Sequence, residues 1–357
     1  MKAIFILVPS MVPTGPVKGA VALANYLVDK RSVTLVSVKK GPGCAAFIDD
    51  RISCICLAHD SAGTFGKIKR YKELLVNAGD RSSVASISLC FSADFVNSFC
   101  SGYALTCSSI RGNLVNIYKM DYGLIGVPAA IIHLVSLFRF DKVVAMSTPM
   151  AEQIKFFSQK NAYVVGNFID ETSLSKSRNA KDDRQRVVKR FVFVGSISIR
   201  KNPLLLVRTL KKLRDGGHNV ELDLVGKGPL TEKVMDEIKL LGLQGAVTMH
   251  GQLPDPYSIM SKADIFVLPS MSEGTSRASL EALYLGLPCV LRKIDGNSEL
   301  IENGVNGVVF ENDQSLYVAM LSALNISESR GHNNNLLPNF FRQRSSAQKY
   351  LEIVEDC

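Results

Sequence analysis

Short apolar runs alternate with helical patterns along most of this chain, and this alternation most constrains its fold. Continuous apolar strands separated by helices are typical of parallel sheets covered on both faces, so the sequence predicts an α/β fold. The expected strands are 4–8, 33–38, 52–57, 84–89, 105–108, 143–145 and 163–165, then 190–194, 220–225, 246–249, 265–268, 289–291 and 308–310. The expected helices are 15–28, 65–76, 124–138 and 149–157, then 203–214, 230–241, 256–261, one ending at Gly286, and a closing helix at 345–354.

A change in composition divides the chain. With 357 residues it exceeds one typical domain. Residues 171–190 are rich in Ser, Lys, Arg and Asp and hold few apolar side chains, as a linker does. We therefore expect a first doubly wound domain over 1–170, a linker over 171–189, a second such domain over 190–340, and a closing segment over 341–357.

Positive charge is concentrated in the first half. Residues 1–170 carry 18 Lys and Arg against 11 Asp and Glu, a net +7, whereas residues 171–357 carry 24 against 22, a net +2. This asymmetry indicates that the first half faces an anionic partner, either a phosphorylated acceptor or an acidic membrane surface. Nucleic acid is not expected, because the chain has neither a zinc-finger pattern nor an RNA-binding aromatic motif.

Two segments of the first half bear on a membrane. Segment 65–75 places Phe65, Ile68 and Leu75 on one helical side and four cations on the rest, which fits a solvated face or contact with a membrane surface. Segment 124–137 is apolar apart from His133 and is too short to span a bilayer. It is either a buried helix or one that dips shallowly into a membrane.

The cysteines and the first residues indicate the compartment. The eight cysteines form no Cys-x-x-Cys pair and have mostly small or apolar neighbours, as buried free thiols in a reducing compartment do. The opening apolar run ends at Pro9 and is too short and too weakly basic for a signal peptide. The expected location is the cytoplasm or the inner face of the cytoplasmic membrane.

The stretch 270–283 carries the strongest indication of a binding site. It follows an apolar strand, passes through a turn of small residues and enters a helix, with Glu273 before the helix and Glu281 about two turns into it, roughly 12 Å further along the axis. Free backbone N–H groups between them would hold an anionic phosphate. One carboxylate could bind a ribose and the other a hexose, which is the shape of a sugar nucleotide. Alternatively, both are ordinary acidic residues that favour the first turns of a helix.

Other polar loops follow the strands of the second half. Loop 195–203 places Arg200 and Lys201 beside a helix start, which suits a diphosphate. Loop 225–229 resembles half of a dinucleotide fingerprint, and 295–299 offers further N–H groups. Because ligands bind beyond the carboxyl ends of parallel strands, we expect these loops to converge on one site.

Two places in the first half are candidates as well. The turn containing Gly15 joins the first strand to the first helix, and it either lets the backbone approach a ligand or is a plain glycine turn. Arg111 leaves a strand end among polar neighbours and suits an anionic acceptor or a donor phosphate.

The second half resembles the retaining glycosyltransferases of family four, which have the two-lobed GT-B fold. The resemblance covers nearly all of 190–325 and rests on these segments: 193–203, 225–229, 249–251, 263–270, 273–282, 286–290 and 299–307. The first half matches more loosely, at 14–16, 143–147 and 167–170. The resemblance implies two Rossmann-like domains facing across a cleft, with the last helix returning to the first domain.

The resemblance also implies roles for residues of the second half. Glu281 would hold the ribose hydroxyls, Glu273 would contact the transferred sugar, and Lys201 would bind phosphate. The arginine usual in the family just after the strand glycine is Ser196 here, so Arg200 would have to supply that charge. The backbone that lines the diphosphate would come from Gly274, Thr275 and Ser276, and the backbone that borders the base from Gly251, Gln252 and Leu253.

In the first half, the resemblance places Gly15 under the donor phosphates and Arg111 near the acceptor or the leaving group. The implied reaction moves a hexose or N-acetylhexosamine from a nucleotide-diphosphate sugar, with a UDP-sugar favoured over a GDP-sugar, to a saccharide acceptor. The basic first half indicates that this acceptor is lipid-linked. The configuration would be retained, in O-antigen or capsule-type polysaccharide synthesis. No cofactor is expected and no metal either, since the chain lacks an Asp-x-Asp pair of the metal-binding sort.

Two alternatives remain. An epimerase of the same fold would act on the nucleotide sugar itself and release free nucleotide without an acceptor. A non-catalytic partner subunit would bind the sugar nucleotide or stabilise a membrane complex, and the serine at position 196 keeps that alternative open.

Overall fold

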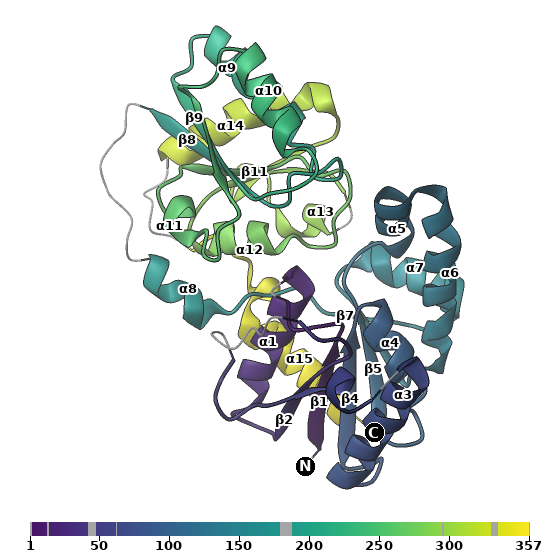
Figure 1. The fold of residues 1–357 in the computed structure, drawn as a ribbon. Helices are drawn as coiled ribbons and strands as arrows, with labels where there is room; N and C mark the ends of the chain where they lie inside the picture. Colours follow the sequence, from purple (N-terminus) through teal and green to yellow (C-terminus); the bar gives the residue numbers. More distant parts are fainter. Residues whose placement is uncertain are drawn as a thin grey trace. The chain divides into compact units, whose positions relative to one another are not determined.

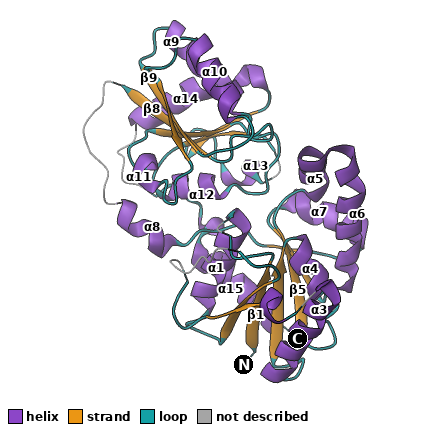
Figure 2. Cartoon of the chain, in the orientation of Figure 1, coloured by secondary structure: helices purple, strands orange, loops and turns teal. Residues whose placement is uncertain are grey.

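The computed structural model of the chain describes residues 2–12, 14–41, 48–61, 63–178, 188–294, 296–329 and 335–356 (Figures 1 and 2). The chain divides into two compact units. Unit 1 comprises Met1–Asp170 and Asn339–Cys357, and unit 2 comprises Glu171–Pro338. Each unit is built on a parallel sheet with helices packed on it, which confirms the predicted α/β architecture.

Unit 1 has a seven-stranded sheet in the order β3-β2-β1-β4-β5-β6-β7. Its strands are β1 Ala3–Val8, β2 Val33–Ser37, β3 Ser53–Cys56, β4 Val84–Leu89, β5 Leu105–Ile110, β6 Lys142–Ala145 and β7 Tyr163–Val164. Its helices are α1 Gly15–Leu27, α2 Leu57–Asp60, α3 Gly63–Ala78, α4 Phe91–Asn97, α5 Leu114–Tyr122, α6 Gly126–Ser136, α7 Thr148–Ser158 and α15 Gln343–Glu355, with short 3-10 turns η2 Gly123–Ile125, η3 Leu137–Arg139 and η5 Asn339–Phe341. The strand order reverses between β1 and β4, where doubly wound sheets hold their ligands.

The closing helix α15 belongs to the core of unit 1, as the fold prediction required. Tyr350 and Val354 are buried in the same apolar cluster as α1 and one face of the sheet. The Tyr350 hydroxyl lies 2.6 Å from the Ser109 hydroxyl of β5, and Lys2 Nζ donates to the Val354 carbonyl at 2.8 Å. The chain therefore returns to complete the unit that it began.

Alternate residues of β1 separate the two faces of this sheet. Ile4 and Ile6 pack against α1 and α15, whereas Phe5 and Leu7 pack against α3 and α4. The sequence prediction missed α4, because this short helix turns two polar residues, Asp94 and Asn97, toward the interior and so has no apolar stripe. It also missed α5, which precedes the predicted helix at 124–138.

Unit 2 has a six-stranded sheet in the order β10-β9-β8-β11-β12-β13. Its strands are β8 Lys189–Val194, β9 Val220–Val225, β10 Val247–Gly251, β11 Ile265–Leu268, β12 Cys289–Arg292 and β13 Gly307–Phe310. Its helices are α8 Glu171–Arg178, α9 Pro203–Asp215, α10 Thr231–Leu240, α11 Tyr257–Met260, α12 Arg277–Tyr284, α13 Asn297–Leu300 and α14 Leu316–Ser329, with the 3-10 turn η4 Asp313–Ser315. α14 was not predicted, because its first six residues, 316–321, are all apolar and show no alternation of polar and apolar faces.

Some local expectations need correction. The expected linker begins with a helix, α8, and residues 179–187 lie outside the described part. α12 begins only at Arg277, so Glu281 is little more than one turn into the helix instead of two. Among the cysteines, Cys100, Cys107 and Cys289 are buried as expected but Cys54 is exposed. Cys44 and Cys357 lie outside the described residues.

Candidate functional site

Loops that leave the carboxyl ends of β8, β9 and β11 are joined to one another in unit 2. Gly195 N donates to Val225 O at 3.0 Å, and Leu230 N donates to Ile197 O at 2.9 Å. The β11 loop joins them where Met271 N donates to Arg200 O at 2.8 Å. The predicted convergence of these loops is therefore present within the unit.

Glycines allow this close packing of backbones. A Cβ atom on Gly226 would lie 1.8 Å from Gly195 O, and one on Gly228 would lie 2.4 Å from Ile197 O. The β12 loop approaches in the same way, since a Cβ on Gly296 would lie 2.6 Å from Thr275 Oγ1. Asp295, at the start of the predicted loop 295–299, lies outside the described residues. At these positions a larger residue would force the loops apart.

A cluster of charged side chains lies between these loops. Lys201 Nζ and Arg200 Nη1 both contact Glu273 Oε1, the arginine at 3.3 Å, and Arg200 Nη1 also donates to Ser272 O at 3.1 Å. The Lys201 and Glu273 side chains are 12% and 9% exposed, so this charge is poorly screened by water. Two cations share one carboxylate, so the trio has a net positive charge of one and suits a further anion.

Glu281 lies in α12 and is held by its neighbours. Arg277 Nε and the Tyr257 hydroxyl both donate to Glu281 Oε1, at 3.0 and 3.1 Å. Burial, and then the negative charge of Glu281, raise the pKa of Tyr257 above its ordinary value, so its hydroxyl keeps its proton and continues to donate. The carboxylate is thus fixed in one orientation.

The turn of small residues between the two glutamates is buried. Gly274, Thr275 and Ser276 have little exposed surface, and Ser276 caps α12 by accepting from Ser279 N at 3.4 Å. The nearby hydroxyls of Ser270, Ser272 and Ser279 are buried, and they have no hydrogen-bond partner among the described residues. Since buried polar groups are normally satisfied, such a group of orphaned hydroxyls is consistent with a polar ligand.

The remaining residues predicted for unit 2 lie on the rim of these loops. Ser196 is exposed and its hydroxyl lies 3.1 Å from that of Ser198. Gly251 adopts a left-handed conformation with φ of 66° and accepts from Gly226 N at 2.7 Å, which joins β10 to the β9 loop. Gln252 and Leu253 follow it in an open loop.

Arg111 and Gly15 belong to unit 1. Arg111 follows β5, donates from Nη2 to Asn167 Oδ1 at 3.2 Å, and lies against α1 so closely that a Cβ on Gly19 would be 1.9 Å from Nη2. Gly15 is the first residue of α1, and a Cβ there would meet nothing within 4 Å. Both residues thus lie at the carboxyl edge of the sheet.

A buried polar network in unit 1 was not found from the sequence. Asp94 of α4 accepts from Ser88 Oγ at 2.6 Å and Ser108 Oγ at 3.0 Å, and its other oxygen lies 2.8 Å from His133 Nε2. The second His133 nitrogen lies 3.2 Å from the Tyr118 hydroxyl. The only signal in the sequence was a lone histidine in an apolar helix. The network joins α4, α5 and α6 to the sheet.

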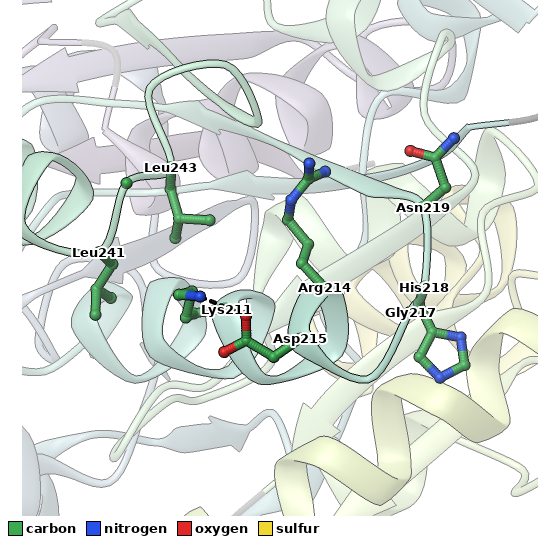
Figure 3. A pocket seen from close by; sticks show the side chains of 9 residues that line it. Lys211, Arg214, Asp215, Gly217, His218, Asn219, Leu241 and Leu243 are labelled. Carbon is green, nitrogen blue, oxygen red and sulfur yellow. Dashed lines mark hydrogen bonds and ion pairs between the residues drawn. The ribbon is translucent and has the colours of Figure 1, made fainter.

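A shallow pocket of about 410 Å³ lies elsewhere in unit 2 (Figure 3). Its lining includes Lys211 and Asp215, which point toward each other on α9, and His218 and Asn219, which precede β9. It is therefore at the amino ends of the strands, opposite to the loops above. Among the described residues, no three His, Cys, Asp or Glu side chains come together in a way that could hold a metal ion.

Comparison with protein families matches residues 175–334 to the model described as glycosyl transferases group 1. Among curated relatives, a UDP-Gal:alpha-D-GlcNAc-diphosphoundecaprenol alpha-1,3-galactosyltransferase of Escherichia coli is 30% identical over 44% of this chain and 43% of its own length. The O-antigen biosynthesis glycosyltransferase WclY of Escherichia coli is 24% identical over 61% of each chain. The matched stretches thus span less than two thirds of these relatives.

Solved structures share the whole fold. The Anabaena HepE structure in complex with UDP and glucose superposes with a TM-score of 0.77 at 17% identity over the full length of both chains. TarM superposes with a TM-score of 0.77 at 13% identity over 99% of each chain. These likenesses show the GT-B fold expected from the sequence. Residues 175–334, which hold the charged cluster and Glu281, carry the sequence pattern of the group 1 glycosyl transferases on that fold.

Proposed function

We propose that this protein transfers a hexose or N-acetylhexosamine from a nucleotide-diphosphate sugar to a lipid-linked saccharide during O-antigen or capsule-type polysaccharide synthesis. The observation that carries the proposal is the contact of Lys201 and Arg200 with Glu273, beside a buried turn of small residues that leads to Glu281. The two cations would hold the diphosphate, and the two carboxylates would hold the sugars on either side of it.

The charges of the cluster fit the chemistry of glycosyl transfer. Breaking the bond between the anomeric carbon and the phosphate oxygen leaves negative charge on the diphosphate. Lys201, Arg200 and the N–H groups of the turn at 274–276 would stabilise that charge without a metal ion. Once the cations bind the diphosphate, Glu273 would be released to accept hydrogen bonds from the hydroxyls of the transferred sugar.

The nature of the substrates is supported by the relatives. HepE was solved with UDP, which favours a UDP-sugar as the donor, and Glu281 would hold its ribose. The galactosyltransferase relative acts on an undecaprenol diphosphate saccharide by its name, which favours a lipid-linked acceptor. We further propose retention of the anomeric configuration and a location at the cytoplasmic face of the membrane, where the basic first half would meet anionic lipid.

The test is a transfer assay with purified protein. It would be incubated with UDP-glucose, UDP-galactose and their N-acetylated forms, together with a diphospholipid-linked monosaccharide, and the products analysed by mass spectrometry and by the proton coupling of the new anomeric centre. We expect one donor to give an elongated, α-linked product, also in EDTA. Glu281→Ala should lose this activity, while Lys211→Ala, in the pocket at the opposite end of the sheet, should keep it.

The results also separate the alternatives. Release of UDP from the donor with no acceptor present would favour an epimerase. The serine at position 196 is the one feature that favours a non-catalytic subunit, because an arginine there would normally complete the phosphate site. UDP binding by calorimetry without turnover on any acceptor would contradict the proposed activity and favour that subunit.

A further inference from the structure

Helix α6 turns most of its large apolar side chains to the outside. Its buried residues are two small ones, Gly126 and Ala130, together with His133 and Leu134. The exposed large side chains along α6, η2 and η3, together with the last residue of α5, are here called the apolar ridge: Tyr122, Leu124, Ile125, Ile131, Ile132, Val135 and Phe138. A helix on the surface of a soluble domain normally has the opposite polarity.

The buried network fixes this orientation. His133 points inward, with Nε2 at 2.8 Å from Asp94 Oδ2 and Nδ1 at 3.2 Å from the Tyr118 hydroxyl. Turning α6 to bury Ile132 would pull His133 out of both contacts and leave Asp94 buried with fewer donors, which is costly. Exposure of the apolar ridge is therefore a stable property of unit 1.

The ridge does not lie on a straight membrane-spanning helix. Residues Leu114–Arg139 are long and apolar enough to cross a membrane by length and composition alone, and 28% of their most apolar window is buried. However, α5 and α6 lie side by side (Figure 1), and the Tyr118 hydroxyl reaches His133 at 3.2 Å, whereas a straight helix would separate these residues by about 22 Å. α6 with η3 is about 21 Å long, shorter than the roughly 30 Å core of a bilayer.

The charges around the ridge indicate what covers it. Exposed cations, Lys119 and Arg139, lie beyond its two ends, and Asp121 is the only carboxylate from 114 to 139. Arg139 is held in place by a bond from Nε to Ser98 O at 3.0 Å. A second copy of this chain would bring the same net positive charge to this face, whereas a bilayer containing anionic lipid would pair with the cations and bury the apolar side chains.

We propose that the apolar ridge inserts in the plane of the membrane, with α6 lying in the interface between headgroups and acyl chains of an anionic bilayer. The proposal deepens the proposed function and rests on its lipid-linked acceptor. α5 begins at Leu114, directly after the loop of Arg111, and Asn113 caps it by accepting from Asn116 N at 3.1 Å. Insertion of the ridge would therefore bring Arg111 toward the headgroup plane, where the phosphates of a lipid-linked acceptor lie.

Vesicle sedimentation with matched triple variants tests the proposal. The vesicles would contain phosphatidylcholine and phosphatidylglycerol. Leu124→Ser, Ile125→Ser and Ile132→Ser together remove the most exposed aliphatic side chains of the ridge, which are 76%, 86% and 63% exposed. The control combines Met235→Ser, Leu240→Ser and Val318→Ser in unit 2, which are 44%, 80% and 61% exposed. We expect the ridge variant to bind about tenfold or more weakly and the control to bind like the wild type.

A tryptophan probe reports insertion directly, because the chain contains no tryptophan. Ile125→Trp should give an emission that shifts to shorter wavelength on vesicles and is quenched by lipids brominated in the acyl chain. Leu240→Trp should show neither change. Emission from position 125 that stays unshifted and unquenched would overturn the proposal.

Other outcomes also decide the matter. The proposal would be overturned if the wild type did not sediment with the vesicles, or if the ridge variant sedimented with them as well as the wild type does. It would also be overturned if the wild type formed a dimer without lipid and the ridge substitutions abolished that dimer. A thermal midpoint equal to that of the wild type would show that the ridge variant is folded. Transfer to a water-soluble acceptor with a short alkyl chain separates the two proposals: the ridge variant should keep it. If the wild type bound vesicles but transferred no sugar to any acceptor, only the proposed function would be contradicted.

Discussion

Lys201 and Glu273 form an ion pair within the loops of unit 2, and Arg200 contacts the same carboxylate oxygen at 3.3 Å. Glu273 thereby holds both cations at the start of α9, where a diphosphate would need them. If a diphosphate binds there, it takes over both cations, and Glu273 becomes available to the sugar. The ion pair is thus the resting form of the proposed donor site.

Replacing Lys201 should weaken binding of the nucleotide more than it weakens the fold. Lys201→Ala removes a charge-assisted hydrogen bond to the diphosphate, worth about 1.5–3 kcal/mol, so the Kd for UDP should rise roughly tenfold to hundredfold. Isothermal calorimetry measures this change. Lys211→Ala is the matched control, because Lys211 is also paired with a carboxylate, Asp215, but lies at the opposite end of the sheet. Equal affinities of the two variants would contradict the assignment.

An arginine at position 196 should be able to take over the role of Arg200 in binding the diphosphate. Arg200→Ala should weaken UDP binding by a similar factor, because it removes the second cation from Glu273 and the diphosphate. Ser196 is exposed beside the same loop, so Ser196→Arg in the Arg200→Ala protein should restore most of the affinity. Calorimetry on the single and double variants gives the comparison. If the arginine at 196 has no effect in the double variant, the two positions do not serve the same phosphate.

The sequence predicted the strands and the polar loops well, because buried parallel strands are continuous apolar runs and their carboxyl ends share one edge. The contact of Lys201 with Glu273 follows from that edge, although the residues are 72 positions apart. Side-chain partners such as Tyr257 on Glu281 could not be predicted, since the residues come from separate elements. α4 escaped prediction because its buried side is partly polar, and that polarity is explained only by His133 and the serines of the sheet.

Glu281 should discriminate nucleotides by their ribose. Its carboxylate is fixed by Arg277 and Tyr257, so it presents one defined acceptor to vicinal hydroxyls. Glu281→Gln should weaken UDP binding about tenfold, the value of a charged hydrogen bond, yet leave the binding of 2′,3′-dideoxy-UDP nearly unchanged. Competition calorimetry with both nucleotides measures the difference. Equal losses for the two nucleotides would show that Glu281 acts on the fold and not on the ribose.

Asp94 should be important for the stability of unit 1. Asp94→Ala leaves Ser88, Ser108 and His133 without their buried acceptor, at a cost of about 1–3 kcal/mol for each unsatisfied group, and we expect a loss of at least about 3 kcal/mol. The thermal midpoint of this unit should fall by roughly 10 °C. Glu152→Ala, which removes an exposed carboxylate from α7, should leave the midpoint unchanged. A stable Asp94→Ala protein would mean that the network does not hold α6 in place.

Gly15 and Gly19 lie one turn apart in α1 and should respond differently to the same added methyl group. A Cβ on Gly15 meets nothing within 4 Å, so Gly15→Ala should fold with an unchanged or slightly raised thermal midpoint. If the backbone of Gly15 borders a bound substrate, the methyl group will collide with that substrate and lower kcat/KM by about tenfold or more. A Cβ on Gly19 would lie 1.9 Å from Arg111 Nη2, so Gly19→Ala should displace the arginine from α1. It should then resemble Arg111→Ala in the transfer assay, and the double variant should be no worse than either single one. Additive losses would show that Gly19 does not act through Arg111, and a fully active Gly15→Ala protein would place the substrate away from the start of α1.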